Sequence, residues 1–357
     1  MTANEQPYDR LREVKQFDDS KIGVKGLVDS GLTTIPRFFQ HPPNIRSGFL
    51  PSSRSKSSYQ IPIIDLSNHR TKIIDQIKSA SSSLGFFQII NHNVPKQTLN
   101  HAISSVKAFN ELPTDEKSQY YHRNLGRGAS FSTNFDLYQS QAASWRDTLQ
   151  IRLGPTPPNP GALPEDLELA IVEWDREIKK LGEELMGLIS EGLGLEKERL
   201  KDMSCLEART VVGHYYPYCP QPDLTIGISS HTDPGVLTVL QQNEVGGLQV
   251  KFDDDWVDIE PVSGALVINI GDLLQIMSND ELKSVEHRVL ANPNHNPRLS
   301  IAVFFNPSKR EELLGPLPEL VSAEKPPVYR EFMMTDFLKR FFSKELDGKS
   351  LTDYYKI

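Results

Sequence analysis

Apolar residues recur at helical spacing in one long stretch that follows Pro164. They step by three or four over about seven helical turns. The stripe consists of Leu167, Ile171, Trp174, Ile178, Leu181, Leu185 and Leu188. Gly192 and Gly194 follow it and predict its end. A stripe of this length needs a broad apolar partner, so we expect the helix at 165–193 to cover a sheet.

Between Glu207 and Pro307 the pattern changes to short apolar runs separated by turn residues. The runs are TVVGHYY, LTIGISSH, VLTVLQ, GLQVKF, WVDIEP, ALVINI, SVEHRVL and RLSIAVFF. Short strands spaced by about 8–12 residues are typical of a sandwich or barrel rather than of a parallel sheet. The sequence therefore predicts a mainly β fold with flanking helices.

Other elements are predicted on both sides of this region. IPIIDL at 61–66 and FFQII at 86–90 predict strands, and the helix between them ends at Gly85. SSRSKSS at 52–58 predicts a flexible connector. Near the C-terminus another apolar stripe predicts a helix; it consists of Tyr329, Phe332, Met333, Phe337 and Phe341.

Two ionisable residues lie on one face of a predicted strand. In GISSHTDPGVLTVL, His231 and Asp233 are two residues apart, so their side chains project to the same side. Burying both without a partner costs several kcal/mol. In SVEHRVL, His287 lies in phase with two valines and predicts a second buried imidazole.

Two histidines and one carboxylate with open positions form the facial triad that holds non-haem Fe(II). A bound cation compensates the carboxylate, and neutral imidazoles serve as ligands. Each piece alone has a plainer explanation, because H-x-D arises by chance and a lone histidine is more often a satisfied core residue. We therefore rest the metal site on the three residues together.

An arginine and a serine follow on the next predicted strand. Arg298 and Ser300 share a face, and Phe304 continues it in phase. A guanidinium pointed into a barrel needs an anion, and its planar fork suits a carboxylate. A structural Arg–Asp pair is the alternative for this motif alone. Beside a metal site, the pair predicts a clamp for an acid that chelates the metal through its other end.

Composition limits the partners. The chain has 357 residues, 38% hydrophobic and 24% charged, with a formal net charge of −8. An acidic balance argues against nucleic acid or an anionic membrane, and no apolar run approaches the ~20 residues of a membrane span. The N-terminus lacks a signal-peptide core, and two cysteines are too few for a disulfide framework. We expect a cytoplasmic monomer that acts on a small molecule.

These motifs, in this order, resemble the plant 2-oxoglutarate- and Fe(II)-dependent dioxygenases. The resemblance covers nearly the whole chain and includes IPIIDL, GFFQIINHNVP, HYYPYCPQPDLTIGISSHTDPGVLTVLQQ, WVDIEPVSGALVINIGDLLQIMSND, SVEHRVL and PRLSIAVFFNP. LREVKQFDDSKIGVKGLVDSGLTTIPRFF and WRDTLQIR look closest to the branch that holds deacetoxyvindoline 4-hydroxylase and homologues of 1-aminocyclopropane-1-carboxylate oxidase.

The resemblance implies a double-stranded β-helix (a cupin-like jelly roll) as the core. It implies an N-terminal extension at 1–60, a helical and strand region at 61–204, the Fe(II)/2-oxoglutarate jelly-roll core at 205–308 and a C-terminal helical lid at 309–357. We treat these parts as one structural unit, because removal of the flanking helices would uncover the apolar faces of the barrel.

The resemblance also implies roles for particular residues. His231, Asp233 and His287 match the iron ligands. Arg298 and Ser300 match the residues that hold the distal carboxylate of 2-oxoglutarate, and Tyr216 matches a tyrosine that reaches the same carboxylate. His214 stands where many relatives have an asparagine that contacts the metal-side carboxylate, so that role is open here. No other catalytic residue is required.

The implied reaction uses O2 and 2-oxoglutarate, releases succinate and CO2, and hydroxylates a C–H bond, with ascorbate in support. Desaturation, ring formation and demethylation begin with the same hydrogen abstraction and stay open. The expected substrate is a mid-sized plant specialised metabolite. Two alternatives are an ascorbate-dependent enzyme like 1-aminocyclopropane-1-carboxylate oxidase and a catalytically silent ligand-binding relative.

Five residues are candidates for substrate contact. Phe304 lies in phase with the anion clamp, and Thr148 and Val212 match positions that line the cavity in relatives. Phe332 and Phe337 on the predicted C-terminal helix would form part of a lid. For all five, plain core packing is the alternative, because aromatic stripes at helical spacing are more often core.

Overall fold

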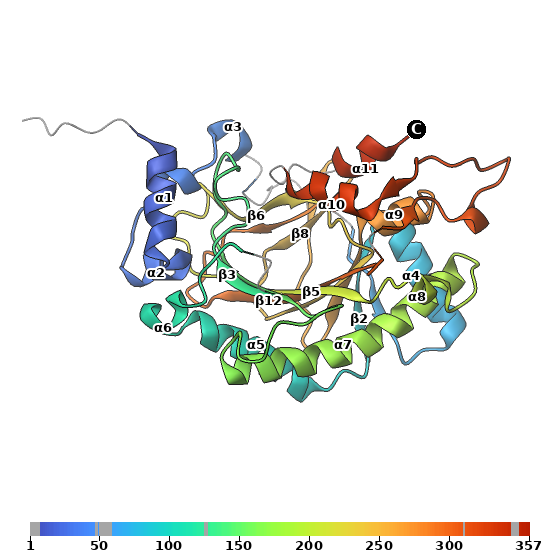
Figure 1. The fold of residues 1–357 in the computed structure, drawn as a ribbon, viewed down its shortest axis with the longest axis horizontal. Coiled ribbons are helices and arrows are strands. Elements are labelled where there is room, and N and C mark those ends of the chain that lie inside the picture. Colours follow the sequence, from blue (N-terminus) through green and yellow to red (C-terminus); the bar gives the residue numbers. More distant parts are fainter. Residues whose placement is uncertain (1–7, 47–48, 50–58, 125–127, 310, 344–349) are drawn as a thin grey trace, which may run out of the picture.

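The computed structural model describes residues 8–46, 49, 59–124, 128–309, 311–343 and 350–357. The predicted connector at 52–58 lies outside the described residues. The described residues form two main sheets with helices around them (Figure 1) and a separate two-stranded sheet of β13 and β14. The large sheet has eight strands in the order β1-β2-β10-β7-β12-β5-β4-β3, and the small sheet has four in the order β6-β11-β8-β9. Every strand pair is antiparallel except β1 with β2, as expected for a mainly β fold.

The strands and helices occupy the following residues. The strands are β1 Ile63–Asp65, β2 Phe86–Ile90, β3 Ala129–Ser132, β4 Asp147–Arg152, β5 Ala208–Tyr216, β6 Ile226–His231, β7 Leu237–Gln242, β8 Leu248–Phe252, β9 Asp255–Asp258, β10 Leu266–Ile270, β11 His287–Leu290, β12 Arg298–Asn306, β13 Leu313–Leu314 and β14 Phe332–Met333. The helices are α1 Arg10–Ser20, α2 Gly23–Asp29, η1 Arg37–Phe39, α3 Pro43–Arg46, α4 Arg70–Ser83, α5 Lys96–Asn110, α6 Thr114–Ser118, α7 Glu165–Gly192, α8 Arg199–Asp202, α9 Asp272–Met277, η3 Pro318–Leu320, α10 Met334–Phe342 and α11 Ser350–Tyr355.

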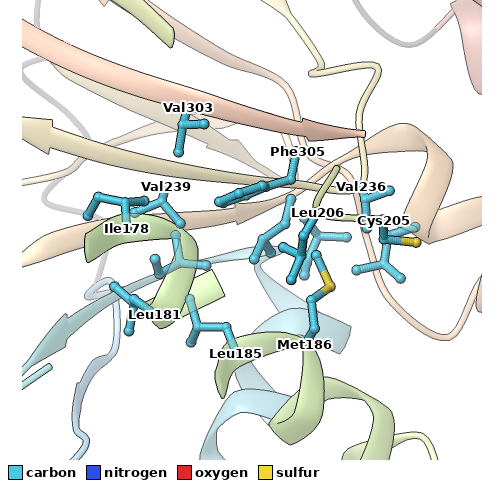
Figure 2. Packing of buried hydrophobic residues seen from close by; sticks show 14 of the residues in the cluster. Ile178, Leu181, Leu185, Met186, Cys205, Leu206, Val236, Val239, Val303 and Phe305 are labelled. Carbon is cyan, nitrogen blue, oxygen red and sulfur yellow. The ribbon is translucent and has the colours of Figure 1, made fainter. Parts of the chain in front are cut away.

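The long helix α7 covers one face of the large sheet, as its stripe predicted. All seven residues of the stripe are buried. Figure 2 shows Ile178, Leu181 and Leu185 of α7 turned toward Val303 and Phe305 of β12. At the middle of this contact α7 has Gly182, where a β-carbon would lie 3.0 Å from the Phe305 ring. The small residue lets the helix approach the sheet closely.

The opposite face of the large sheet looks into the interior of the fold. Directly opposed residues of an antiparallel pair share a face. Thr148 of β4 pairs with His214 of β5, and His214 pairs with Ser300 of β12. Side chains of this inner face include half-buried Gln150 and Phe304, whereas the helix-covered face is fully buried. The helices therefore seal one face, and the other borders the space between the two sheets.

The N-terminal extension is folded onto the core. Val14, Phe17 and Phe39 pack with Trp145 in a separate apolar cluster, which also joins α1, α2 and η1 to the loop before β4. Asp147 anchors the start of α2: its carboxylate accepts hydrogen bonds from the backbone N–H groups of Val24 and Lys25, each at 2.8 Å. The extension thus closes the end of the sheet at which β4 begins.

The C-terminal stripe differs in part from its prediction. Phe332 and Met333 belong to the short strand β14, which pairs with β13, and the helix α10 begins only at Met334. Phe332 stacks on Phe337 with 4.9 Å between ring centroids and also contacts Tyr355 of α11. The spacing of apolar residues continues across the boundary between strand and helix, so spacing alone predicted a single helix.

No helix in the described part of the chain is long and apolar enough to cross a membrane. Both cysteines are free and buried, in agreement with the expected lack of a disulfide framework. Burial raises the pKa of the Cys205 and Cys219 thiols to about 12. Both thiols are therefore protonated at neutral pH.

The contact of α2 with Asp147 gives a stability prediction. Gly23 has a φ of +69°, and a β-carbon there would lie 2.6 Å from the Asp147 carboxylate. Gly31 has a φ of +78° with open space around it. Gly31→Ala therefore carries only the backbone strain of about 1 kcal/mol, whereas Gly23→Ala also displaces a buried carboxylate.

We expect Gly23→Ala to lower the free energy of unfolding by at least about 1 kcal/mol more than Gly31→Ala does. Chemical denaturation of the two variants measures the difference. Equal losses would show that the contact between α2 and Asp147 contributes nothing to stability.

Candidate metal centre

Three side chains converge in the interior: two come from strands β6 and β11 of the small sheet, and the third comes from the loop that follows β6. His231 ends β6, His287 begins β11, and the two residues are directly paired across these strands. Asp233 follows β6 by two residues. Its Oδ1 lies 3.6 Å from the Nε2 atom of each imidazole. One ligand atom from each of these three buried residues lies within 4.8 Å of the other two, so the group could hold a single metal ion.

The imidazoles are oriented by the backbone. His231 Nδ1 lies 2.8 Å from the carbonyl oxygen of Ser229, and His287 Nδ1 lies 3.3 Å from that of Val285. A carbonyl only accepts, so each Nδ1 carries the proton and each Nε2 is left with its lone pair. Both lone pairs belong to the nitrogens that face Asp233.

The charges of the site suit a cation. Burial, together with the neighbouring His287, lowers the pKa of His231 to about 3, so this imidazole is neutral at pH 7. Burial alone would raise the pKa of Asp233, but the two imidazoles and hydrogen bonds from Thr238 and Asn269 lower it overall. Asp233 is only 3% exposed. The site therefore holds a buried carboxylate anion beside a neutral imidazole ligand.

Two residues that the sequence reasoning missed hold the carboxylate. Thr238 Oγ1 of β7 donates a hydrogen bond to Asp233 Oδ2 at 2.6 Å, and Asn269 Nδ2 of β10 donates to the same oxygen at 2.7 Å. Oδ2 is thus occupied, and Oδ1 faces the imidazoles. A signal for Asn269 was present, because it is the one polar residue in the apolar run ALVINI.

The sequence-predicted anion clamp lies on the inner face of the large sheet. Arg298 is 0% exposed, and its Nη2 donates to Gln242 Oε1 at 2.8 Å. Its Nη1 lies 3.3 Å from Ser300 Oγ, and its Cζ lies 4.9 Å from the centre of the Tyr216 ring. Its Nε has no hydrogen-bond partner, and none of the described acidic residues forms an ion pair with Arg298.

Burial lowers the pKa of Arg298, although nearby Tyr216 opposes the shift. An arginine stays protonated in proteins despite such a shift. A buried guanidinium without a carboxylate partner is costly, and an incoming carboxylate would satisfy it. The residues present therefore fit a metal ion at the three ligands and a carboxylate at Arg298.

Two family models match this chain. The 2OG-Fe(II) oxygenase superfamily model matches residues 208–307, and the model of the non-haem dioxygenase in morphine synthesis N-terminal region matches residues 61–168. The chain is 44% identical over 357 residues to 1-aminocyclopropane-1-carboxylate oxidase homolog 1 of Arabidopsis thaliana, with 98% of this chain and 97% of the relative covered.

The chain belongs to the 2OG-Fe(II) oxygenase superfamily.

Other relatives and solved structures agree with this oxygenase assignment. A 1-aminocyclopropane-1-carboxylate oxidase homolog of Solanum lycopersicum is 41% identical, with 99% of this chain and 98% of the relative covered. The crystal structure of JOX2 in complex with 2OG, Fe and JA matches with a TM-score of 0.84 and 30% identity over 94% of this chain and 97% of that chain. The dioxygenase for auxin oxidation in rice matches with a TM-score of 0.70 and 27% identity over 84% of this chain and 100% of that chain.

These matches confirm the predicted jelly-roll core with flanking helices. The protein is a dioxygenase, and its cofactors are Fe(II) and 2-oxoglutarate.

His214 of this oxygenase lies on β5, directly opposite Ser300 of the anion clamp. The pKa of His214 lies well below its usual value because of burial and, after that, because of the nearby Arg146 and Arg298 charges. Its Nδ1 lies 3.1 Å from Thr148 Oγ1. His214 is thus a neutral side chain of the inner face, in the same cross-strand row as Ser300.

The five candidates for substrate contact fall into two groups. Thr148, Val212 and Phe304 are all on the inner face of the large sheet. Phe332 of β14 and Phe337 of α10 instead belong to the apolar core cluster, where both contact Tyr355 of α11. Only the first group borders the space between the two sheets.

The hydrogen bonds to Asp233 give a test of metal affinity. Thr238→Val keeps the shape of the side chain but frees Asp233 Oδ2 from one of its two donors. Loss of such a supporting partner typically weakens metal binding 10- to 100-fold. We expect a loss of this size in Mn(II) affinity, measured by calorimetry.

Thr232→Val is the matched control. Thr232 neighbours Asp233 in sequence and is equally buried, but its hydroxyl donates to Asp272 at 2.9 Å and to no metal-site residue. If the two variants bind Mn(II) equally well, Thr238 does not support the site.

Proposed function

We propose that this dioxygenase hydroxylates a C–H bond of a mid-sized plant specialised metabolite, with His231, Asp233 and His287 as the metal ligands. Arg298, Ser300 and Tyr216 bind the distal carboxylate of 2-oxoglutarate. The observation that carries the proposal is the buried guanidinium of Arg298, which has no carboxylate partner and lies in the same interior as the three converging ligands.

When bound, Fe(II) and 2-oxoglutarate supply the oxidising chemistry, with O2 as oxidant and succinate and CO2 as products. The chain supplies positioning. Thr238 and Asn269 hold Asp233 so that one oxygen is presented to the metal. The two backbone carbonyls hold the imidazoles with Nε2 forward.

The inner face directs the cosubstrate. Gln242 and Ser300 contact the Arg298 fork and fix its plane before any acid binds. The Tyr216 ring packs against the guanidinium, and Gly227 behind it leaves room for that ring, because a β-carbon there would lie 2.9 Å from it. A fixed fork loses little side-chain entropy when a carboxylate arrives.

The substrate contacts are Thr148, Val212 and Phe304 on the inner face, of which Thr148 and Phe304 are half-buried. Phe304 offers an aromatic surface, and Thr148 and Val212 form the wall beside it. A hollow of about 640 Å³ lined by Arg152, Thr156 and Ser308 lies at the end of β4 and β12.

Phe332 and Phe337 support the lid rather than the wall. Phe337 lies on the buried side of α10 and Phe332 of β14 stacks against it, so a substrate would meet them only after α10 moves. The plant relatives support a plant metabolite as substrate: JOX2 was solved with JA, and the rice neighbour is a dioxygenase for auxin oxidation. Ascorbate in support, a cytoplasmic location, a monomeric state and the lack of nucleic-acid or membrane partners stay predictions.

Several relatives are named as homologues of 1-aminocyclopropane-1-carboxylate oxidase, so the alternative of an ascorbate-dependent enzyme is tested as well. Incubation with Fe(II), O2, 2-oxoglutarate and plant extract separates the alternatives, because only our proposal couples succinate release to a mass gain of one oxygen. His231→Ala, which removes one ligand, should abolish both. Succinate-independent product would support the alternative, and no turnover with any extract would support a silent ligand-binding relative.

The clamp gives a second prediction. Arg298→Met should weaken 2-oxoglutarate binding to the Mn(II)-loaded protein by about 100-fold or more, because a charge-assisted pair is lost. Binding of 2-oxopentanoate, which lacks the distal carboxylate, should change little. Calorimetric titration of the two acids measures both effects.

Arg288→Met is the control. Arg288 is also buried and lies on β11, but it bonds to Gln249 and packs over Trp256. A loss of 2-oxopentanoate binding as large as that of 2-oxoglutarate in Arg298→Met would contradict the assigned role of Arg298.

A further inference from the structure

A second arginine is buried between the two sheets. Arg146 immediately precedes β4 and is 2% exposed. Asp147 points outward to α2, so Arg146 and Thr148, on either side of it, point inward. Arg146 Nη1 reaches across to the small sheet and donates to the carbonyl oxygen of Gly227 at 3.0 Å. The guanidinium therefore lies in the interior rather than in the wall of the fold.

Arg146 has no carboxylate partner. Its Nε lacks any hydrogen-bond partner, and Arg146 forms no ion pair with any acidic residue in the part of the chain that the structure describes. Asp136 and Asp147 act on it only at longer range. Arg209, by contrast, meets Asp175 through Nε and Nη2 at 2.9 and 3.0 Å. Arg146 thus lacks the carboxylate partner that Arg209, a structural arginine of the same protein, has.

A count of the charges at the metal centre, on 2-oxoglutarate and on the two arginines of the inner face leaves Arg146 unbalanced. Fe(II) is balanced by Asp233 and by the metal-side carboxylate of 2-oxoglutarate. Arg298 is balanced by the distal carboxylate. One positive charge then remains, on Arg146, which is buried where an unpaired ion is unfavourable. A further group with a single negative charge would balance it.

We propose that Arg146 binds a carboxylate of the primary substrate, between Thr148 and Tyr216 on the inner face. The inference rests on the proposed function, which assigns the other charges. It narrows the substrate class to monocarboxylic acids. Nη1 of Arg146 donates to the carbonyl oxygen of Gly227. The Nε side of the planar guanidinium is left to bind the acid.

The first experiment needs neither metal nor substrate. An unpaired buried charge destabilises the ligand-free fold, so replacement by an apolar side chain of similar length relieves it. Arg146→Met should therefore melt at the same temperature as the parent or above it. Arg209→Met, which leaves Asp175 without its partner, should melt several degrees lower. A drop for Arg146→Met as large as that for Arg209→Met would assign Arg146 a structural role and overturn the proposal.

The second experiment uses the full chain loaded with Mn(II) and 2-oxoglutarate. The probes are 3-phenylpropanoic acid, 4-phenylbutanoic acid and decanoic acid, each with its primary amide as an uncharged match. Calorimetry should show tighter binding of acid than of amide, by roughly 10- to 100-fold for the best pair. Arg146→Gln should remove the preference for the acid without changing the affinity for 2-oxoglutarate.

The remaining outcomes count against the proposal. Equal binding of acid and amide to the parent protein, or no acid-selective binding by any pair, would overturn it. Weaker 2-oxoglutarate binding by Arg146→Gln would place Arg146 in the cosubstrate site instead. Failure of the parent to bind Mn(II) and 2-oxoglutarate would refute the proposed function, and the melting comparison would still decide whether Arg146 is structural.

Discussion

A charged group buried in a protein needs a partner of opposite charge, and the interior between the two sheets holds several charged groups whose partners are missing from the chain itself. Asp233 is held by two neutral donors, and Arg298 meets a glutamine and a serine rather than an acid. The arrangement is costly for the isolated chain. It becomes favourable once Fe(II) and 2-oxoglutarate bring charges of the complementary sign.

The large sheet has two different faces, and the apolar packing of its outer face stabilises the fold despite the unpaired charges in the interior. Ile178, Leu181 and their neighbours on α7 seal the outer face, where Val303 and Phe305 are fully buried (Figure 2). The inner face has the polar side chains of Thr148, His214 and Ser300, which border the space between the two sheets. The WRD motif shows the same division within three residues: Trp145 packs against the N-terminal extension, Arg146 reaches into the interior, and Asp147 holds the start of α2.

Much of the fold and of the metal site can be predicted from the sequence, because the spacing of residues along a helix or strand determines which face each side chain occupies. The stripe of α7, the shared face of Arg298 and Ser300, and the convergence of the H-x-D motif with His287 were all visible in the pattern. Contacts between strands distant in sequence were not visible. The hydrogen bond from Asn269 to Asp233 depends on β10 pairing with β7, and the boundary between β14 and α10 depends on pairing with β13. Neither register can be read from local periodicity.

The central claim is that three side chains hold one ferrous ion that retains open positions for a keto acid. Anaerobic addition of Fe(II) and 2-oxoglutarate to the purified protein tests it most directly by visible absorption. The account predicts a charge-transfer band that needs both components and is lost in Asp233→Ala. A spectrum without that band, or a band that persists in Asp233→Ala, would contradict it.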